Sequence, residues 1–178
     1  EDVFSLLDNL LKWTKSQIGK LKVVYQELNM VEVVEGVREI FTMVAGLKNI
    51  KIVQDMPVVP VVVRADIDML KTVIRNLISN AIKFSNEGSE VLVSLTEEDG
   101  MAIVSVKDSG CGIEEENQKK LLHTDTHFST FGTNNEEGSG LGLLLCQDFI
   151  VKNGGKLWFT SKKGEGSTFS FSVPLLEK

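Results

Sequence analysis

Residues that build covalent or metal-bound scaffolds are scarce in this chain. Its 178 residues include two cysteines, Cys111 and Cys146, and two histidines, His123 and His127. The cysteines lie far apart in the sequence and in no spacing typical of a metal site. This usage predicts a reducing compartment and excludes a fold that depends on a disulfide framework.

The two histidines are four positions apart, a spacing that places side chains on one face of a helix. A metal pair is one interpretation, but no cysteine lies nearby and Asp125 is the acidic residue between them, so metal ligation is not favoured. The surrounding segment, 123–139, is long, polar and irregular, which is typical of a mobile loop that closes over a site. We expect Phe128 and Phe131 to anchor this loop.

Positive charge and long apolar runs are also scarce. With 19 basic and 25 acidic residues, the chain carries a net charge of −6, which argues against general nucleic-acid binding. No apolar run approaches the length of a membrane span, and no signal peptide is visible. Because Glu1 stands within a helical pattern with no initiating Met before it, we expect the chain to be part of a longer protein.

What the chain does contain is a regular pattern of apolar residues. They make up 42% of the sequence, enough for the core of one domain, and their spacing alternates between helical and strand periods. Helices are expected over 31–47 after an Asn29 cap, from an Asp66 cap to about 86–88, over 114–122, and from the glycine-rich segment 138–142 through 150 to a stop at 153–155. Strands are expected over 21–28, 50–53, 58–63, 91–95, 102–106, 156–161 and 168–173.

The first segment predicts a helix that ends near Ser16. Its apolar residues form two adjoining stripes, which suits a helix packed in a bundle. One stripe holds Phe4, Leu7, Leu11, Thr14 and Ile18, and the other holds Val3, Leu6, Leu10 and Trp13. Because the rest of the chain offers such a helix few partners, we expect it to self-associate; the alternative is that it folds back on the domain.

A line of polar residues runs along one side of the helix predicted after Asp66, and we call it the polar stripe. Asn76, Asn80 and Lys83 make up this stripe, next to a buried face formed by Leu70, Ile74, Leu77, Ile78 and Ala81. Asparagine is disfavoured inside helices, so two of them one turn apart need a reason. Amide oxygens suit a hard cation and an ammonium suits phosphate; the alternative is a solvated helix edge.

A carboxylate ends one strand of the first predicted hairpin. Period two places Asp108 on the same face as Val104 and Val106, toward the core, where a carboxylate needs partners. Gly110 and Gly112 follow it and allow a close approach to the backbone. One interpretation is a carboxylate that meets a flat ligand in a glycine-walled pocket, and the other is a helix cap or loop carboxylate.

A second glycine-rich segment, 138–142, leads into an apolar helix and predicts an anion site at the helix N-terminus. It superficially resembles a dinucleotide fingerprint, but no parallel-sheet unit follows it, so that interpretation is rejected. Gly164 and Gly166 mark another turn with an exposed backbone, inside the last hairpin.

Taken in order, four motifs resemble the N, G1, G2 and G3 boxes of the ATP-binding domain of sensor histidine kinases, in the GHKL superfamily. They are Asn76…Asn80-Ala-Ile-Lys83-Phe, Asp108-Ser-Gly110-Cys-Gly112-Ile, Gly138-Ser-Gly140-Leu-Gly142-Leu and Gly164-Glu-Gly166-Ser-Thr168. The resemblance covers about 23–175 and implies an α+β two-layer sandwich, a mixed sheet backed by three helices. Residues 1–20 look like the end of the second helix of a histidine kinase dimerisation domain, which leaves 21–178 as the catalytic and ATP-binding domain.

The resemblance also implies roles for individual residues. Asn80 would hold Mg²⁺ against the phosphates of ATP, and Asn76 and Lys83 would meet the phosphates or a bridging water; these three residues carry the catalytic role. Asp108 would accept a hydrogen bond from the adenine amino group, with Thr168 beside it. Further nucleotide contacts are implied for Phe84, Gly110, Gly112, Ile113, Phe128, Gly138, Ser139, Gly140, Leu141, Gly142 and Leu143.

The function implied is transfer of the ATP γ-phosphate to a histidine on a dimerisation domain that is absent from this chain. The implied partners are that His-phosphotransfer domain of the same parent protein, expected to be a homodimer, and a response regulator receiver domain. The domain would be cytoplasmic, and the resemblance allows a parent anchored in the bacterial inner membrane. The alternatives are a GHKL ATPase that drives conformational change and a nucleotide-binding module without catalysis.

Two departures from the family pattern affect these expectations. Between Leu121 and Gly140 there is no lysine or arginine, although many members carry a basic residue there to steady the γ-phosphate. His123 and His127 match no phosphoacceptor motif, so we expect that the isolated chain does not phosphorylate itself.

Overall fold

A five-stranded mixed sheet lies at the centre of the fold, with strand order β2-β4-β5-β7-β6. Its parallel pair is β2 with β4, and the other neighbours are antiparallel. The strands are β2 (Lys51–Asp55), β4 (Glu90–Glu98), β5 (Met101–Asp108), β6 (Leu157–Lys162) and β7 (Gly166–Pro174). This is a computed structural model, and it describes residues 3–121 and 141–177.

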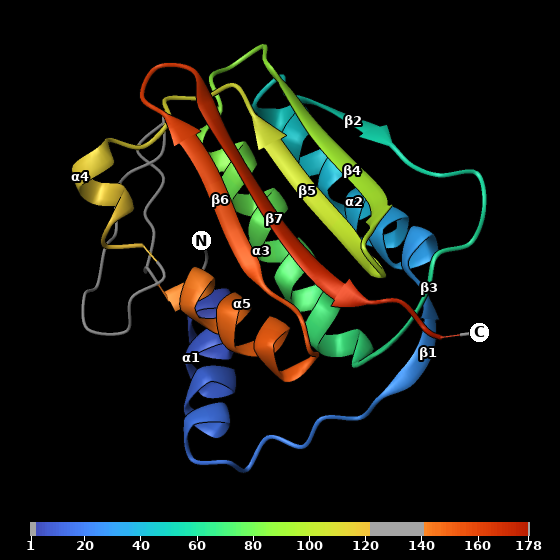
Figure 1. Ribbon diagram of the computed structural model, residues 1–178. Helices are drawn as coiled ribbons and strands as arrows, with labels where there is room; N and C mark the ends of the chain where they lie inside the picture. The colour runs from blue at the N-terminus through green and yellow to red at the C-terminus, as the bar shows by residue number, and fades with distance from the viewer. Residues whose placement is uncertain (1–2, 122–140, 178) are drawn as a thin grey trace.

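Three helices form the second layer. They are α2 (Met30–Leu47), α3 (Ile67–Phe84) and α5 (Leu141–Lys152). Figure 1 shows α2 and α3 behind the sheet, with α5 beside α3 near β6. The predicted α+β sandwich of a mixed sheet and three helices is therefore confirmed.

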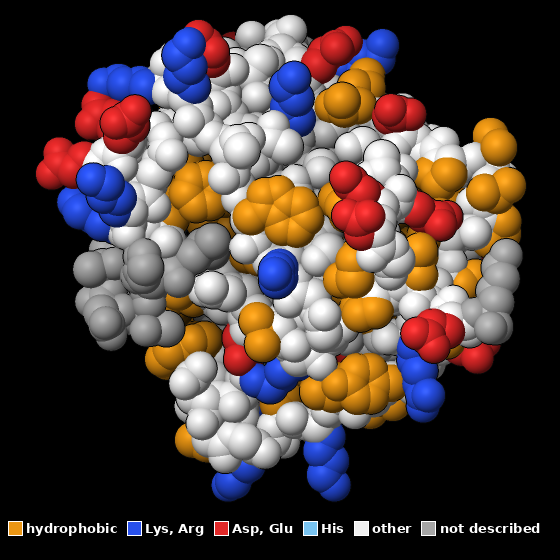
Figure 2. All heavy atoms as spheres, viewed as in Figure 1, with side chains coloured by type: hydrophobic (Ala, Val, Ile, Leu, Met, Phe, Trp, Pro, Cys, Tyr) orange, Lys and Arg blue, Asp and Glu red, His pale blue; other side chains and the backbone are white. Residues whose placement is uncertain are grey.

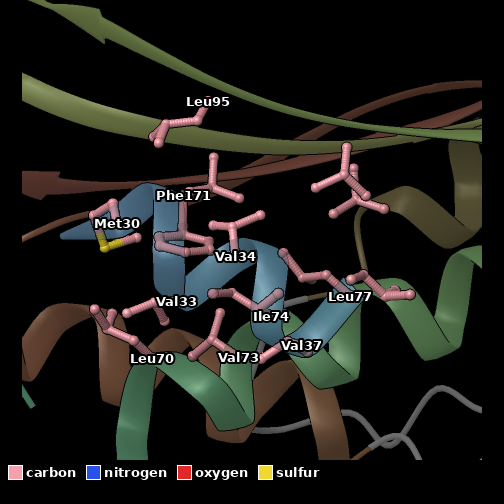
Figure 3. Packing of buried hydrophobic residues seen from close by; sticks show 14 of the residues in the cluster. Met30, Val33, Val34, Val37, Leu70, Val73, Ile74, Leu77, Leu95 and Phe171 are labelled. Carbon is pink, nitrogen blue, oxygen red and sulfur yellow. The ribbon is translucent and has the colours of Figure 1, made fainter. Parts of the chain in front are cut away.

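The core lies between these two layers. Figure 3 shows Leu95 from the sheet above Val34 of α2 and Ile74 and Leu77 of α3, with Phe171 from the sheet beside Val34. The buried face predicted for α3 is confirmed in full, from Leu70 to Ala81. Burying one such Leu, Ile or Phe side chain stabilises the fold by about 1.5–3 kcal/mol, so this face holds α3 firmly under the sheet.

Two predicted helix caps are confirmed. Asn29 accepts a hydrogen bond from the backbone N–H of Val31 at 3.2 Å, at the start of α2. Asp66 accepts from the N–H groups of Asp68 and Met69 at the start of α3, at 3.0 and 3.1 Å. These side chains satisfy N–H groups that have no partner inside their helices.

The strands before α2 and α3 differ from their prediction. The first is β1 (Gln26–Asn29) and not 21–28, because the N–H of Val24 donates to Asp66 Oδ2 at 2.9 Å instead of entering a ladder. The other is β3 (Val62–Ala65) and not 58–63, since Pro60 has no N–H to donate. These two strands pair in a small antiparallel sheet of their own.

The helix expected over 114–122 is a single turn, α4 (Glu115–Gln118), within the described residues. Between Ile113 and Leu121 the sequence contains no apolar residue. A longer helix there would have no face to bury, and isolated short helices are marginal in water.

The first segment forms helix α1 (Val3–Gln17), which packs against α5. Ser16 is 6% exposed; its hydroxyl donates to Asp148 of α5 and accepts from Lys152 Nζ at 2.8 Å. The other side of α1 is open to solvent, with Phe4 83% exposed. Contact with the domain, the alternative considered above, is therefore present, and self-association through the exposed stripe stays a prediction.

The face of the sheet turned away from the helices is open. On it lie Trp158 of β6, 39% exposed, and Lys107 of β5, which is exposed as well. Figure 2, which looks onto this face, shows hydrophobic side chains interspersed with charged ones. No helix among the described residues is long and apolar enough to cross a membrane.

Candidate functional site

Asp108 lies at the end of β5 with its side chain directed toward the core, as predicted. It is 5% exposed, and its Oδ1 accepts hydrogen bonds from the N–H groups of Gly110 at 2.9 Å and Ser167 at 3.3 Å. Burial raises the pKa of the carboxyl, and these two N–H donors oppose the rise. The result is a desolvated acceptor at the end of the middle strand of the sheet, bonded by the N–H groups of the loop that follows it and of β7.

The neighbour of Asp108 in the sheet is Ser167, not Thr168 as expected. In the antiparallel register of β5 and β7, Asp108 is opposite Ser167 and Lys107 is opposite Thr168. Residues opposite each other share a face, so Thr168 lies with Lys107 on the open side of the sheet. The sequence showed the Ser-Thr pair but not the register, which decides which of the two faces the core.

The glycines after Asp108 let parts of the chain itself approach closely. A Cβ on Gly110 would lie 2.0 Å from the carbonyl oxygen of Phe84, at the end of α3. Gly112 has φ +65°, and a Cβ there would lie 2.0 Å from the carbonyl oxygen of Lys162, at the end of β6. The close approach that the sequence predicted is thus made by backbone, which fixes the loop after β5 between α3 and the β6–β7 turn.

The predicted polar stripe of α3 is half-buried along its length: Asn76, Asn80 and Lys83 are all intermediate in exposure. Asn76 Nδ2 donates to the carbonyl oxygen of Thr72 at 2.8 Å, which directs Oδ1 away from the helix backbone. Lys83 Nζ lies 5.1 Å from the centre of the Phe84 ring, a cation–π distance. A fully solvated helix edge does not describe these side chains.

The start of α5 lies against this stripe. A Cβ on Gly142 would come within 2.8 Å of Asn76 Oδ1, so α3 and α5 are in contact at this point. Leu141 and Leu143 are half-buried on either side. The other predicted residues of this region lie outside the described residues: Phe128, Phe131, Gly138, Ser139 and Gly140, together with His123 and His127.

A metal ion would find few protein ligands here. Among residues 3–121 and 141–177, no three His, Cys, Asp or Glu side chains gather in a way that could hold a metal. Amide oxygens such as those of Asn76 and Asn80 do suit a hard cation such as Mg²⁺. The site fits Mg²⁺ if the phosphates of a nucleotide supply the remaining oxygens.

Residues 65–177 match the family of histidine kinase-, DNA gyrase B- and HSP90-like ATPases, and the chain belongs to this family. The match covers α3, the five-stranded sheet apart from β2, and α5, and so includes Asp108 and the α3 stripe.

Several of the similar proteins are named as histidine kinases. The chain is 34% identical over 171 residues to the adaptive-response sensory kinase SasA of Crocosphaera subtropica, covering 96% of this chain and 44% of that protein. It is 32% identical over 133 residues to the sensor histidine kinase WalK of Bacillus subtilis, covering 74% of this chain and 22% of that protein. The chain therefore spans less than half the length of these relatives.

Among solved structures, the catalytic domain of the histidine kinase ThkA superposes with a TM-score of 0.73 and 30% identity, covering 85% of this chain and 95% of that one. Full-length ShkA superposes with a TM-score of 0.81 over 98% of this chain and 36% of that one; at 23% identity this likeness concerns the fold.

Proposed function

We propose that this chain is the catalytic and ATP-binding domain of a sensor histidine kinase, which transfers the γ-phosphate of ATP to a histidine on the dimerisation domain of its parent protein. The observation that carries the proposal is the buried Asp108 carboxylate at the end of β5, whose following loop contacts the C-terminal end of α3, the helix that also carries Asn76 and Asn80. The named relatives support the same reaction.

In this proposal Asp108 accepts a hydrogen bond from the 6-amino group of adenine. A carboxylate offers only acceptors when ionised, so it discriminates against a 6-oxo purine at that position. The proposed nucleotide contacts near this carboxylate are Phe84, at the end of α3, and Gly110, Gly112 and Ile113, in the loop after β5. Thr168 is not proposed as a neighbour of Asp108, because the register places Ser167 there.

The α3 stripe would meet the phosphates. Asn80 would hold Mg²⁺, and Asn76 and Lys83 would contact the phosphates or a bridging water; Mg²⁺ would neutralise charge on the transferring group. Backbone N–H groups at the start of α5, from Leu141 to Leu143, would add anion binding at a helix N-terminus. Positioning and charge neutralisation are the main requirements of phosphoryl transfer, and these residues can provide both.

The partners belong to the proposal as well. They are the dimerisation and His-phosphotransfer domain of the same parent, expected as a homodimer with residues 1–20 as the end of its second helix, and a response regulator receiver domain. We also propose that the domain is cytoplasmic, whether or not the parent is anchored in a membrane.

Two measurements test the proposal. Calorimetric titration should detect binding of Mg²⁺-ATP and of a non-hydrolysable analogue to this chain. Incubation with radiolabelled ATP should leave the chain unlabelled, because a phosphoacceptor must present its imidazole in line with the γ-phosphate on an element that can dock and withdraw. A dimerisation domain fused before Glu1 should then become labelled on its own histidine, with an acid-labile, alkali-stable bond.

The outcomes separate the alternatives. Failure to bind ATP would contradict the whole proposal. Binding without transfer to any supplied histidine-bearing domain would favour a non-catalytic module, and rapid hydrolysis without transfer would favour an ATPase. Acid-labile label on the unfused chain that disappears in His123→Gln or His127→Gln would contradict the expected absence of self-phosphorylation.

A further inference from the structure

A continuous chain of hydrogen bonds links Asp108 to helix α4. The N–H of Ser167 donates to Asp108 Oδ1, and the hydroxyls of Ser167 and Ser161 are 2.7 Å apart. Ser161 Oγ also accepts the N–H of Ile113 at 2.8 Å. Gln118 completes the chain, because its Nε2 donates to the carbonyl oxygens of Ile113 at 2.8 Å and Ser161 at 3.0 Å.

Gln118 uses both of its amide hydrogens in this arrangement. One side-chain NH₂ group carries two donors, and here each reaches a backbone carbonyl on a different segment: one on the loop after β5, the other on β6. Gln118 is half-buried, so these bonds are partly shielded from competing water. A single side chain on α4 thereby holds the Ile113 loop against the edge strand of the sheet.

Ser161 has an equally complete set of partners. A hydroxyl offers one donor and two acceptor sites. Ile113 N–H occupies one acceptor site, while Ser167 Oγ at 2.7 Å and the carbonyl oxygen of Gly166 at 3.2 Å compete for the rest. The Ser161 hydroxyl therefore determines whether the Ser167 hydroxyl donates to Ser161 or can donate to another acceptor near Asp108.

We propose that Gln118 and Ser161 are positioning residues for base recognition: they hold the Ile113 loop and Ser167 so that the Asp108 carboxylate selects a 6-amino purine over a 6-oxo purine. This inference rests on the proposed nucleotide function. Neither residue is expected to touch the nucleotide; both act through Ile113, Ser167 and the backbone between them.

The physical basis is that selection by a hydrogen bond depends on direction as well as presence. Burial keeps Asp108 away from solvent, and its orientation depends on the N–H donors of Gly110 and Ser167. If the loop and β7 relax, water can reach the carboxylate and bridge it to either purine. The penalty for the wrong base then decreases even though the binding site as a whole remains.

The test compares the affinities of ATP and inosine triphosphate, which differ at position 6 of the purine, for the full chain in the presence of Mg²⁺. Gln118→Leu removes both amide donors with little change in size, and Gln118→Met is a second variant of similar length. Ser161→Ala removes the shared hydroxyl. Glu116→Leu, an exposed change on the same α4 turn, is the matched control. Thermal melting of each variant reports the stability of the fold separately.

We define selectivity as the dissociation constant of inosine triphosphate divided by that of ATP. We expect this ratio to fall about five- to tenfold in the Gln118 variants and in Ser161→Ala. This is less than the loss expected for removing a charge-assisted hydrogen bond outright. Glu116→Leu should leave the ratio unchanged. Because both positions act through the same loop, the double variant Gln118→Leu with Ser161→Ala should lose no more selectivity than the more affected single variant.

A merely structural role would lower the melting temperature without changing the ratio, and that result would overturn the inference while leaving the proposed function intact. If the unsubstituted chain binds the two triphosphates equally, the assignment of Asp108 to the base is wrong, and the inference is wrong with it. If it binds neither, the proposed function itself is contradicted.

Discussion

Gly142 and Asn76 meet where the first turn of α5 crosses α3, and a Cβ on Gly142 would lie 2.8 Å from Asn76 Oδ1. This contact joins two predicted site motifs that are separated by more than sixty positions in the sequence, roughly a third of the chain. It makes the Asn76 side chain the neighbour that must move if α5 acquires a side chain at this point.

Gly142→Ala should separate stability from ligand binding. Alanine gains about 1 kcal/mol in helix propensity over glycine, but its methyl group forces the Asn76 amide to turn away from Thr72. We expect an unchanged or slightly higher melting temperature and an affinity for Mg²⁺-ATP lower by about tenfold, the loss of one phosphate hydrogen bond. Gly36→Ala, in open space on α2, is the control, and it should raise stability without changing affinity.

Asp108→Asn should lose ATP affinity by about ten- to a hundredfold, the effect of losing a charge-assisted hydrogen bond. The amide presents its own N–H₂ donor toward the adenine amino group, although it can still accept from Gly110 and Ser167. The fold should therefore persist, and removing a buried charge should not reduce its stability. Calorimetry together with thermal melting measures both effects, and an unchanged ATP affinity would contradict the role of Asp108.

The pH dependence of the fold follows from the raised pKa of Asp108. The folded state holds this proton more tightly than the unfolded chain, in which the aspartate has its ordinary pKa. Between the ordinary and the raised pKa, stability should increase as the pH falls, and this contribution should be lost as the pH rises through the folded-state pKa. The difference in unfolding free energy between the parent chain and Asp108→Asn, followed against pH by denaturant titration, isolates the effect; a pH-independent difference would show that burial does not shift this carboxyl.

ATP affinity should depend on pH in the opposite direction. Protonation of Asp108 removes the ionised acceptor, so affinity should decrease as the pH falls through the raised pKa. Inosine triphosphate, which has no 6-amino group, should show a smaller decrease, and equal decreases for the two nucleotides would contradict the assignment.

Asn80→Ala should abolish the Mg²⁺ dependence of nucleotide affinity and leave the fold intact, because Asn80 lies beside the packed face of α3 and not within it. Titration of ATP with and without Mg²⁺ measures the dependence. Ser79→Ala, an exposed neighbour on the same helix, should behave as the unsubstituted chain does. If nucleotide affinity in Asn80→Ala depends on Mg²⁺ as it does in the unsubstituted chain, Asn80 is not a metal ligand.

Ser16→Ala should loosen α1 without unfolding the domain. The change removes a buried hydroxyl between α1 and the Asp148–Lys152 pair, and that pair remains joined within α5 at 2.8 Å. A hydrogen bond to a charged group contributes about 1.5–3 kcal/mol, so amide exchange in α1 should accelerate by roughly ten- to a hundredfold. Exchange in α3 should not change, and Gln17→Ala, an exposed neighbour, is the control.

Features that depend on local periodicity and local chemistry could be predicted from the order of the residues. The buried face of α3, the caps at Asn29 and Asp66, and the core-facing side of Asp108 all follow from spacings within one helix or strand. Hydrophobic period and side-chain capping act over a few residues, so they can be predicted before the fold is known. The order of the four motifs was likewise sufficient to indicate the family.

How distant segments meet depends on the packing of the whole fold. The register of β5 with β7 placed Ser167, and not Thr168, beside Asp108, and a shift of one residue would have reversed that choice. Packing showed that Gly110 and Gly112 make room for the chain's own backbone, and that Gln118, in a segment with no apolar period, joins the loop after β5 to strand β6. Such contacts depend on the relative position of elements far apart in the sequence, which no local pattern encodes.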